Sequence, residues 1–278
     1  MRPSRRVLRY AGIYLAALAF LAFALVPFLW MVASSLKPPG EIYTMPPRWI
    51  IGNPTLQHYV RVLRESNMPR YFWNTALVAG GTTLFALAFA IGAGYGFARF
   101  QFKGKEFWSL FVLFSQMLPQ AVLLIPLYLF LDRMYLINTT HGLGLSYLVI
   151  TLPLSVWLLR GYFAGIPREL EEAAMIDGCS RLGALLRVVM PISAPAIVAT
   201  GIYIFTVAWQ EFMFAMNFAT TTRTKTISIG IVEFMGEHVV DWGGVMAASV
   251  VVTLPVLVVF LAVHRFFVRG LTEGSVTG

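Results

Sequence analysis

A dense group of acidic side chains lies in the segment 166–178, which reads IPRELEEAAMIDG and contains Glu169, Glu171 and Glu172. Acids in the first turn of a helix interact favourably with the positive end of its dipole. Pro167 stands just before them, where proline suits a first helical position. Gly178 follows as a natural left-handed stop. We therefore expect a helix of about three turns.

Small and apolar side chains share one face of this expected helix, because Leu170, Ala173 and Ala174 are spaced i, i+3, i+4. Such a smooth strip can be approached closely by another protein surface, with Glu169 and Glu172 beside it. A surface helix without any partner is the alternative.

A second short helix is expected directly after Gly178. Ser180 can cap it, and Pro191 ends it. Its apolar positions repeat at i, i+3, i+4 and i+7, which predicts one apolar face lying against the rest of the protein: Leu182, Leu185, Leu186 and Val189.

A polar and aromatic group occurs near the end of a long apolar run: Trp209, Gln210, Glu211 and Asn217. Carboxylates and amides bond hydroxyl groups, and aromatic faces stack on sugar rings. An acid inside an apolar helix is expensive and is a candidate functional residue. These side chains can line a passage for a solute. A buried hydrogen bond that ties helices together is the alternative.

Three further polar residues, Gln116, Gln120 and Tyr128, share one face of another apolar run, provided that Pro119 and Pro126 do not rotate it. A polar stripe on an apolar helix faces protein or water rather than lipid. It can line a pore or bond a neighbouring helix.

No catalytic pattern is found. The sequence lacks the G-x-x-x-x-G-K-[ST] loop that cradles a nucleotide triphosphate. The single cysteine, Cys179, excludes an intramolecular disulfide. The histidines are scattered and have no metal-ligand spacing: His58, His141, His238 and His264. We expect neither an enzyme nor a bound metal or cofactor. The net charge of +8 is interpreted as a consequence of membrane topology rather than of nucleic-acid binding.

The elements that must position these groups are membrane helices, since 58% of the 278 residues are hydrophobic and only 12% are charged. A soluble protein has about 25% charged residues. Crossing a bilayer takes about 20 apolar helical residues. Lipid leaves backbone groups no other partner, so the fold class is all-α. We expect one transmembrane domain over 1–278, with six spans at about 10–33, 73–97, 107–131, 142–159, 194–216 and 244–264.

The positive residues set the orientation, because Lys and Arg near span ends stay in the cytoplasm. If the N-terminus is inside, the inner segments (1–9, 98–106, 160–193 and 265–278) hold 13 of the 21 Lys and Arg residues. The longer outer segments hold the other 8. This favours cytoplasmic N- and C-termini, and places segment 160–193, called here the connecting loop, in the cytoplasm.

The connecting loop resembles a known motif. Glu172-Ala173-Ala174, then Gly178, Val188 and Met190-Pro191, is similar to the EAA motif of ABC importer permeases, whose usual form is E-A-A-x3-G-x9-I-x-L-P. Val188 and Met190 depart from it with apolar replacements. The resemblance implies coupling to ATPase subunits through Glu171, Glu172, Ala173, Ala174, Asp177, Gly178 and Pro191.

The resemblance covers nearly the whole chain. It is strongest to the carbohydrate branch of these permeases, and within that branch to the smaller permease subunit of the maltose type. The similar segments are Ser34-Ser35-Leu36-Lys37, Tyr95-Gly96-Phe97-Ala98-Arg99-Phe100, Ile125-Pro126-Leu127-Tyr128, Trp209-Gln210-Glu211-Phe212 and Gly270-Leu271-Thr272. Gln210 stands where asparagine is more usual.

This family implies a binding-protein-dependent sugar importer in a bacterial inner membrane. It implies as partners a second permease, as a heterodimer, two cytoplasmic ATPase subunits that use ATP with Mg, an external solute-binding protein and membrane lipid. Two alternatives stay open: a permease for a non-sugar solute such as glycerol phosphate, and an ion-coupled secondary carrier. The secondary carrier would be expected to show an inverted repeat or paired ionisable groups, and neither is seen.

Overall fold

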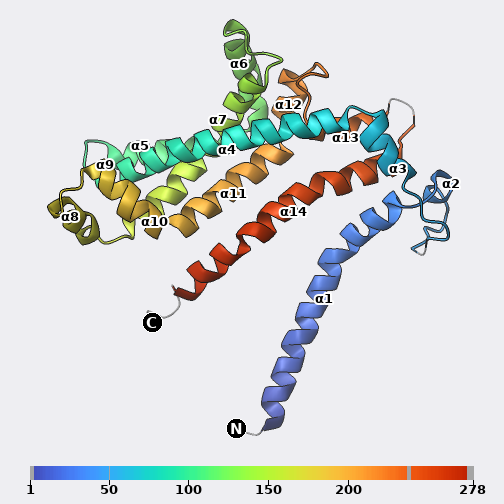
Figure 1. Ribbon diagram of the computed structural model, residues 1–278, viewed down its shortest axis with the longest axis horizontal. Coiled ribbons are helices and arrows are strands. Elements are labelled where there is room, and N and C mark those ends of the chain that lie inside the picture. The colour runs from blue at the N-terminus through green and yellow to red at the C-terminus, as the bar shows by residue number, and fades with distance from the viewer. Residues whose placement is uncertain (1–2, 50, 237–238, 274–278) are drawn as a thin grey trace. The chain divides into compact units, whose positions relative to one another are not determined.

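The computed structural model describes residues 3–49, 51–236 and 239–273, and these contain helices and no strand. The predicted cytoplasmic ends of the chain lie partly outside these residues. Figure 1 shows the helices in chain order. Their bounds are α1 Pro3–Ser35, α2 Pro39–Ile42, α3 Gln57–Val60, α4 Met68–Arg99, α5 Lys105–Phe114, α6 Gln120–Arg133, α7 Thr140–Ala164, α8 Glu169–Ile176, α9 Arg181–Ala184, α10 Met190–Ile192, α11 Ala194–Gln210, α12 Met213–Phe218, α13 Ile227–Glu233 and α14 Trp242–Glu273. Three short non-α turns join them: η1 Arg61–Glu65 and η3 Leu185–Val189, which are π-helical, and the 3-10 turn η2 Ser115–Met117.

Four helical stretches are long and apolar enough to cross a membrane: Arg9–Ser35, Met68–Arg99, Thr140–Ala164 and Trp242–Val263. Many of their large apolar side chains are exposed, such as Phe20 at 75% and Phe23 at 80%. In water this exposure would be costly, whereas lipid is a favourable solvent for it. The expected all-α membrane fold is confirmed. Two further pairs of helices pass the same test only jointly, so the described residues allow four to six spans, and six stays a prediction.

The expected span 107–131 is broken rather than continuous. The pair Lys105–Met117 and Gln120–Arg133 meets at a bend of 100°. Leu118 is extended, with φ −70° and ψ 124°. The ring of Pro119 disfavours the helical conformation in the preceding residue, which explains the break. Gln116 and Gln120 therefore do not lie on one face of a single helix, contrary to the expectation.

The expected span 194–216 also ends early. α11 stops at Gln210, and Glu211 has an extended backbone with φ −63° and ψ 132°. α12 begins again at Met213. At its other end α11 meets Arg181–Ile192 at a bend of 80°. Glu211 is thus placed in a break between two helices and not in the interior of one.

The chain divides into two compact units. Unit 1 consists of Met1–Pro69 and Ile231–Leu254. Within it Arg61 donates to Asp241 at 2.6 Å. The other Asp241 oxygen accepts the Gly244 N–H at 3.1 Å, at the start of α14. The Arg61–Asp241 ion pair joins the two separate stretches of unit 1.

Unit 2 consists of Arg70–Gly230 and Pro255–Gly278. α7 contacts α5, α6, α11 and α12 within it, and Tyr147, Leu159 and Phe163 of α7 are completely buried. A core cluster joins the C-terminal halves of α4 and α7 to the connecting loop: Ala90, Tyr95, Ala98, Val156, Leu159, Phe163, Ile166, Leu185 and Val189. This core fixes the connecting loop to the unit.

Candidate functional site

The backbone of the connecting loop agrees with the sequence expectation at Gly178 and at Ser180. Gly178 has φ +88°, the left-handed conformation predicted for it. The Ser180 hydroxyl accepts the Gly183 N–H at 3.1 Å, which is the predicted cap. The first helix, α8, has two turns rather than three. It begins at Glu169 with Arg168 as its N-terminal flanking residue, so Pro167 lies before the helix.

The second helical stretch of the loop is less regular than predicted. α9 passes into the π-helical turn η3 and then into α10, which runs through Pro191 to Ile192. A proline ring clashes with the carbonyl four residues earlier in a regular α-helix. The wider π turn that precedes Pro191 gives this ring room, so the helix passes the proline by one residue.

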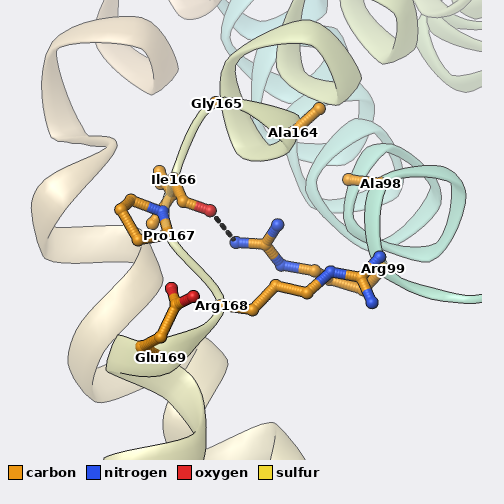
Figure 2. Close-up of a pocket in the computed structure, with 8 residues that line it drawn as sticks. All are labelled: Ala98, Arg99, Ala164, Gly165, Ile166, Pro167, Arg168 and Glu169. Carbon is orange, nitrogen blue, oxygen red and sulfur yellow. Dashed lines mark hydrogen bonds between the residues drawn. The ribbon is translucent and has the colours of Figure 1, made fainter.

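Glu171 is the buried acid of α8, with 6% exposure. Arg99 at the end of α4 donates to one carboxylate oxygen at 2.5 Å, and Tyr95 donates its hydroxyl to the other at 2.7 Å. Arg99 also donates to the Ile166 carbonyl at 2.9 Å, which is the dashed line in Figure 2. A buried carboxylate is stable only when it is paired and hydrogen-bonded in this way. These bonds attach α8 to α4 and to the end of α7.

The opposite side of α8 is exposed. Leu170 is 44% and Ile176 is 85% exposed, while Glu172 and Ala173 are also exposed and Ala174 is half-buried. Of the expected strip, Leu170 and Ala173 therefore face outward, and Ala174 turns partly inward. Asp177, Gly178 and Pro191 are exposed as well. We call the exposed residues Leu170, Glu172, Ala173, Ile176 and Asp177 the outer face of α8.

A cleft of about 590 Å³ opens beside α8 (Figure 2). Its walls are the last residues of α4, the end of α7 and the first residue of α8. It is lined by Ala98, Arg99, Ala164, Gly165, Ile166, Pro167, Arg168 and Glu169. The backbone of the link between α7 and α8 and the guanidinium groups of Arg99 and Arg168 make this cleft a polar surface at the start of the connecting loop.

The second predicted group, around Glu211, is divided between the interior and the surface. Trp209 is 3% exposed, and its ring packs on Phe205 with ring centroids 5.3 Å apart. Glu211 is 6% exposed and accepts two N–H groups at the start of α12. Gln210 and Asn217 are exposed, and Asn217 bonds the Met213 carbonyl of its own helix at 2.8 Å. The four side chains do not form one continuous wall in this structure.

Gln116 and Gln120 both line one cavity of about 230 Å³ despite the break between them. The Gln116 amide donates to the Ile150 carbonyl of α7 at 2.9 Å. Ser115 and Tyr203 also line the cavity. Tyr128 does not, and its ring instead lies 6.1 Å from that of Phe218.

Sequence reasoning did not find the partners of the loop on α4, Tyr95 and Arg99. Their segment was noted only for its resemblance to a family. A signal was present, because Arg99 ends an apolar span on the side where the three acids of α8 were expected. Nothing local, however, indicates which of these acids Arg99 binds.

Comparison with known proteins then decides the family. A family model described as the binding-protein-dependent transport system inner membrane component matches residues 86–273, which is more than half of the chain. The chain belongs to this family. The matched region begins within α4 and includes the connecting loop and both polar groups. As a member of this family of ABC importer permeases, the chain is a transporter subunit of the inner membrane and not an enzyme.

Similar permeases are known from several organisms. The trehalose/maltose transport system permease protein MalG of Thermococcus litoralis is 38% identical over 277 residues, which cover 99% of this chain and 98% of that protein. The diacetylchitobiose uptake system permease protein DasC of Streptomyces coelicolor is 32% identical, with 91% of each chain covered. In fold, the chain resembles a chain in the crystal structure of a bacterial ABC transporter that imports the polysaccharide alginate, with a TM-score of 0.81, 19% identity and coverage of 96% and 99%.

Proposed function

We propose that this chain is the permease subunit of an ATP-driven sugar importer, working as one transmembrane domain with cytoplasmic N- and C-termini. The connecting loop transmits the movement of the ATPase subunits to the membrane helices. The single observation that carries this proposal is the two-sided environment of α8. Its buried side is bonded to α4 through Glu171, and its opposite side is exposed.

The outer face of α8 suits docking to another protein. Small side chains such as Ala173 permit close approach, and exposed apolar side chains such as Leu170 and Ile176 gain energy when they are covered. Glu172 and Asp177 supply charge at the edge of this face. We assign the ATPase contact to this face, with Ala174, Gly178 and Pro191 shaping the loop around it.

The partners follow from the family. Two cytoplasmic ATPase subunits hydrolyse ATP with Mg, a second permease completes the passage as a heterodimer, and an external binding protein delivers the solute. This chain binds no cofactor of its own. A solved relative in fold is described as a bacterial alginate ABC transporter in complex with a pentasaccharide-bound periplasmic protein, which agrees with such an assembly.

Sugar is the solute class supported best. The relatives from Thermococcus litoralis and Streptomyces coelicolor carry trehalose/maltose and diacetylchitobiose in their names. The cavity lined by Gln116 and Gln120 presents amide groups, which bond hydroxyls as donors and acceptors. We place this cavity on the passage, together with Gln210 and Asn217, whose amides are exposed. We place three further side chains in a second layer, which packs behind the residues that line the passage: Tyr128, Trp209 and Glu211.

Co-purification of the complete transporter tests this function. We expect the chain to retain a second permease and an ATPase, and the solute-binding protein that works with it to bind oligosaccharides in a ligand screen. Selective binding of glycerol phosphate would replace the sugar assignment. Uptake driven by an ion gradient without any ATPase would contradict the proposal as a whole.

A further inference from the structure

The two adjacent acids of α8 occupy opposite environments. Glu172 is exposed on the outer face, whereas the Glu171 side chain is 7% exposed and touches α4. The Arg99 side chain is equally buried, at 7%. Ion pairs shielded from water in this way are weakened little by salt. The two acids therefore cannot have the same role.

Arg99 contacts two different parts of the connecting loop. Its Nε donates to the Glu171 carboxylate in α8, and its Nη2 donates to the Ile166 carbonyl in the link between α7 and α8. A guanidinium group is planar and holds its donors in a fixed arrangement. One side chain therefore fixes both the position and the direction of α8 relative to the end of α4.

One further contact holds the loop on the same end of α4. The Arg181 guanidinium of α9 lies over the Phe100 ring, 5.0 Å from its centroid. The Tyr95 ring packs edge-on against Phe100, with centroids 6.3 Å apart, while the Tyr95 hydroxyl bonds Glu171. Figure 1 shows α8 and α9 at the end of α4 that these residues form. The attachment thus includes the start of each loop helix.

We propose that the Arg99–Glu171 pair is a mechanical link that makes α8 and the C-terminal part of α4 move as one body. A push on the outer face of α8 then reaches a membrane helix directly, without first bending the loop. Glu171, Arg99 and Tyr95 are positioning residues, and docking belongs to the outer face. The inference rests on the proposed coupling function and assigns its internal transmission to one ion pair.

The pair gives way when one partner is removed, since the remaining charge is then buried without compensation. Glu171→Gln leaves Arg99 in this state, whereas Arg99→Gln together with Glu171→Gln removes both charges. Transport per ATP in the double variant should therefore be no lower than in the more impaired single variant, as is usual for residues that act as a pair. Independent residues would instead show additive effects.

Distance measurement tests the link without knowledge of the solute. Spin labels are placed at Ala93, in the C-terminal part of α4, and at Glu169 of α8. Both positions are exposed, and Cys179→Ser removes the native thiol. The complete transporter is compared with and without ATP. We expect one narrow distance distribution in both states of the parent. Glu171→Gln should broaden the distribution, and ATP should shift it.

Coupling is measured on the same variants as transport per ATP hydrolysed. Glu171→Gln should retain the ATPase subunits and lower transport per ATP at least about fivefold, in the range of typical coupling energies. Glu65→Gln is the matched control, because Glu65 is an exposed acid in unit 1. A purely structural role would lower the amount of complex and leave transport per ATP unchanged.

Four results would overturn the link: a parent distance that shifts with ATP, a Glu171→Gln distribution as narrow as the parent's, unchanged transport per ATP in Glu171→Gln, or additive effects of the two single variants on transport per ATP. Failure of the proposed function is distinguishable, since the parent chain would then bring down no ATPase subunit. The narrow parent distribution and its broadening in Glu171→Gln are still measured in that case, and they decide the link independently.

Discussion

The carboxylate of Glu211 accepts the backbone N–H of Phe214 at 2.8 Å, just after α11 has ended. Its second oxygen accepts the Ala215 N–H at 3.1 Å. The first N–H groups of a helix have no partner within the helix, and a negative charge there is stabilised by the helix dipole. Glu211 therefore caps the start of α12.

This cap predicts a stability difference between two variants. Glu211→Ala leaves two buried N–H groups without an acceptor and should lower the stability of the assembled complex by about 1–3 kcal/mol. Glu211→Gln keeps one acceptor oxygen, so it should lower the stability of the complex by less than Glu211→Ala does. Thermal unfolding of the purified complex measures both, with the exposed Thr222→Ala as control. Equal stability of the Ala and Gln variants would remove the capping role.

Gly178 should resist substitution for backbone reasons alone. A methyl group added there would meet no atom within 4 Å, yet φ is +88°. A side chain in the left-handed region costs about 1–2 kcal/mol, so Gly178→Ala should loosen the loop. Gly161 in α7 also has open space, and Gly161→Ala should be neutral or stabilising. Protease cleavage of the connecting loop compares the two variants. Equal cleavage rates would contradict the backbone argument.

Local features of the loop could be predicted from the sequence. The stop at Gly178 and the cap at Ser180 depend on residues within three positions of each other, so residue type alone determines them. Breaks in the apolar runs were harder to predict. Pro119 ends a helix, whereas Pro126 and Pro153 lie inside α6 and α7. The presence of a proline alone therefore does not decide between a helix that continues and a break.

Long-range pairing was beyond the sequence. Arg99 and Glu171 are 72 residues apart, and three acids stood close together as possible partners. Which of them turns inward depends on how α8 rotates on the core below it. The same holds for Glu211, whose apolar surroundings suggested a helix interior, and no local signal indicated an extended backbone at that residue.

The cavity between Gln116 and Gln120 should affect solute affinity. Gln116→Ala removes an amide that lines the cavity, and one neutral hydrogen bond contributes about 0.5–1.5 kcal/mol. We therefore expect the KM for uptake to rise about two- to tenfold, with the maximal rate per complex less affected. Gln101→Ala, at an exposed position before α5, is the control. An unchanged KM would exclude Gln116 from the passage.

The proposed orientation places residues 98–106 in the cytoplasm and 217–243 outside. Cysteines at Thr222 and Lys103, both exposed, are introduced into a Cys179→Ser chain. An impermeant thiol reagent should label the Thr222→Cys variant in intact cells, and the Lys103→Cys variant only after permeabilisation. Labelling of Lys103→Cys in intact cells would reverse the topology.

Coupling through the outer face of α8 is tested most directly by ATP-driven uptake into proteoliposomes, measured per chain with the solute that the binding protein selects. Parent transporter and Glu172→Lys are compared, because this change reverses a charge on the outer face and leaves Glu171 bonded to Arg99. The account predicts that Glu172→Lys enters the membrane in normal amount, retains less ATPase subunit and loses uptake. Uptake equal to that of the parent, with a full complement of ATPase subunits, would contradict it.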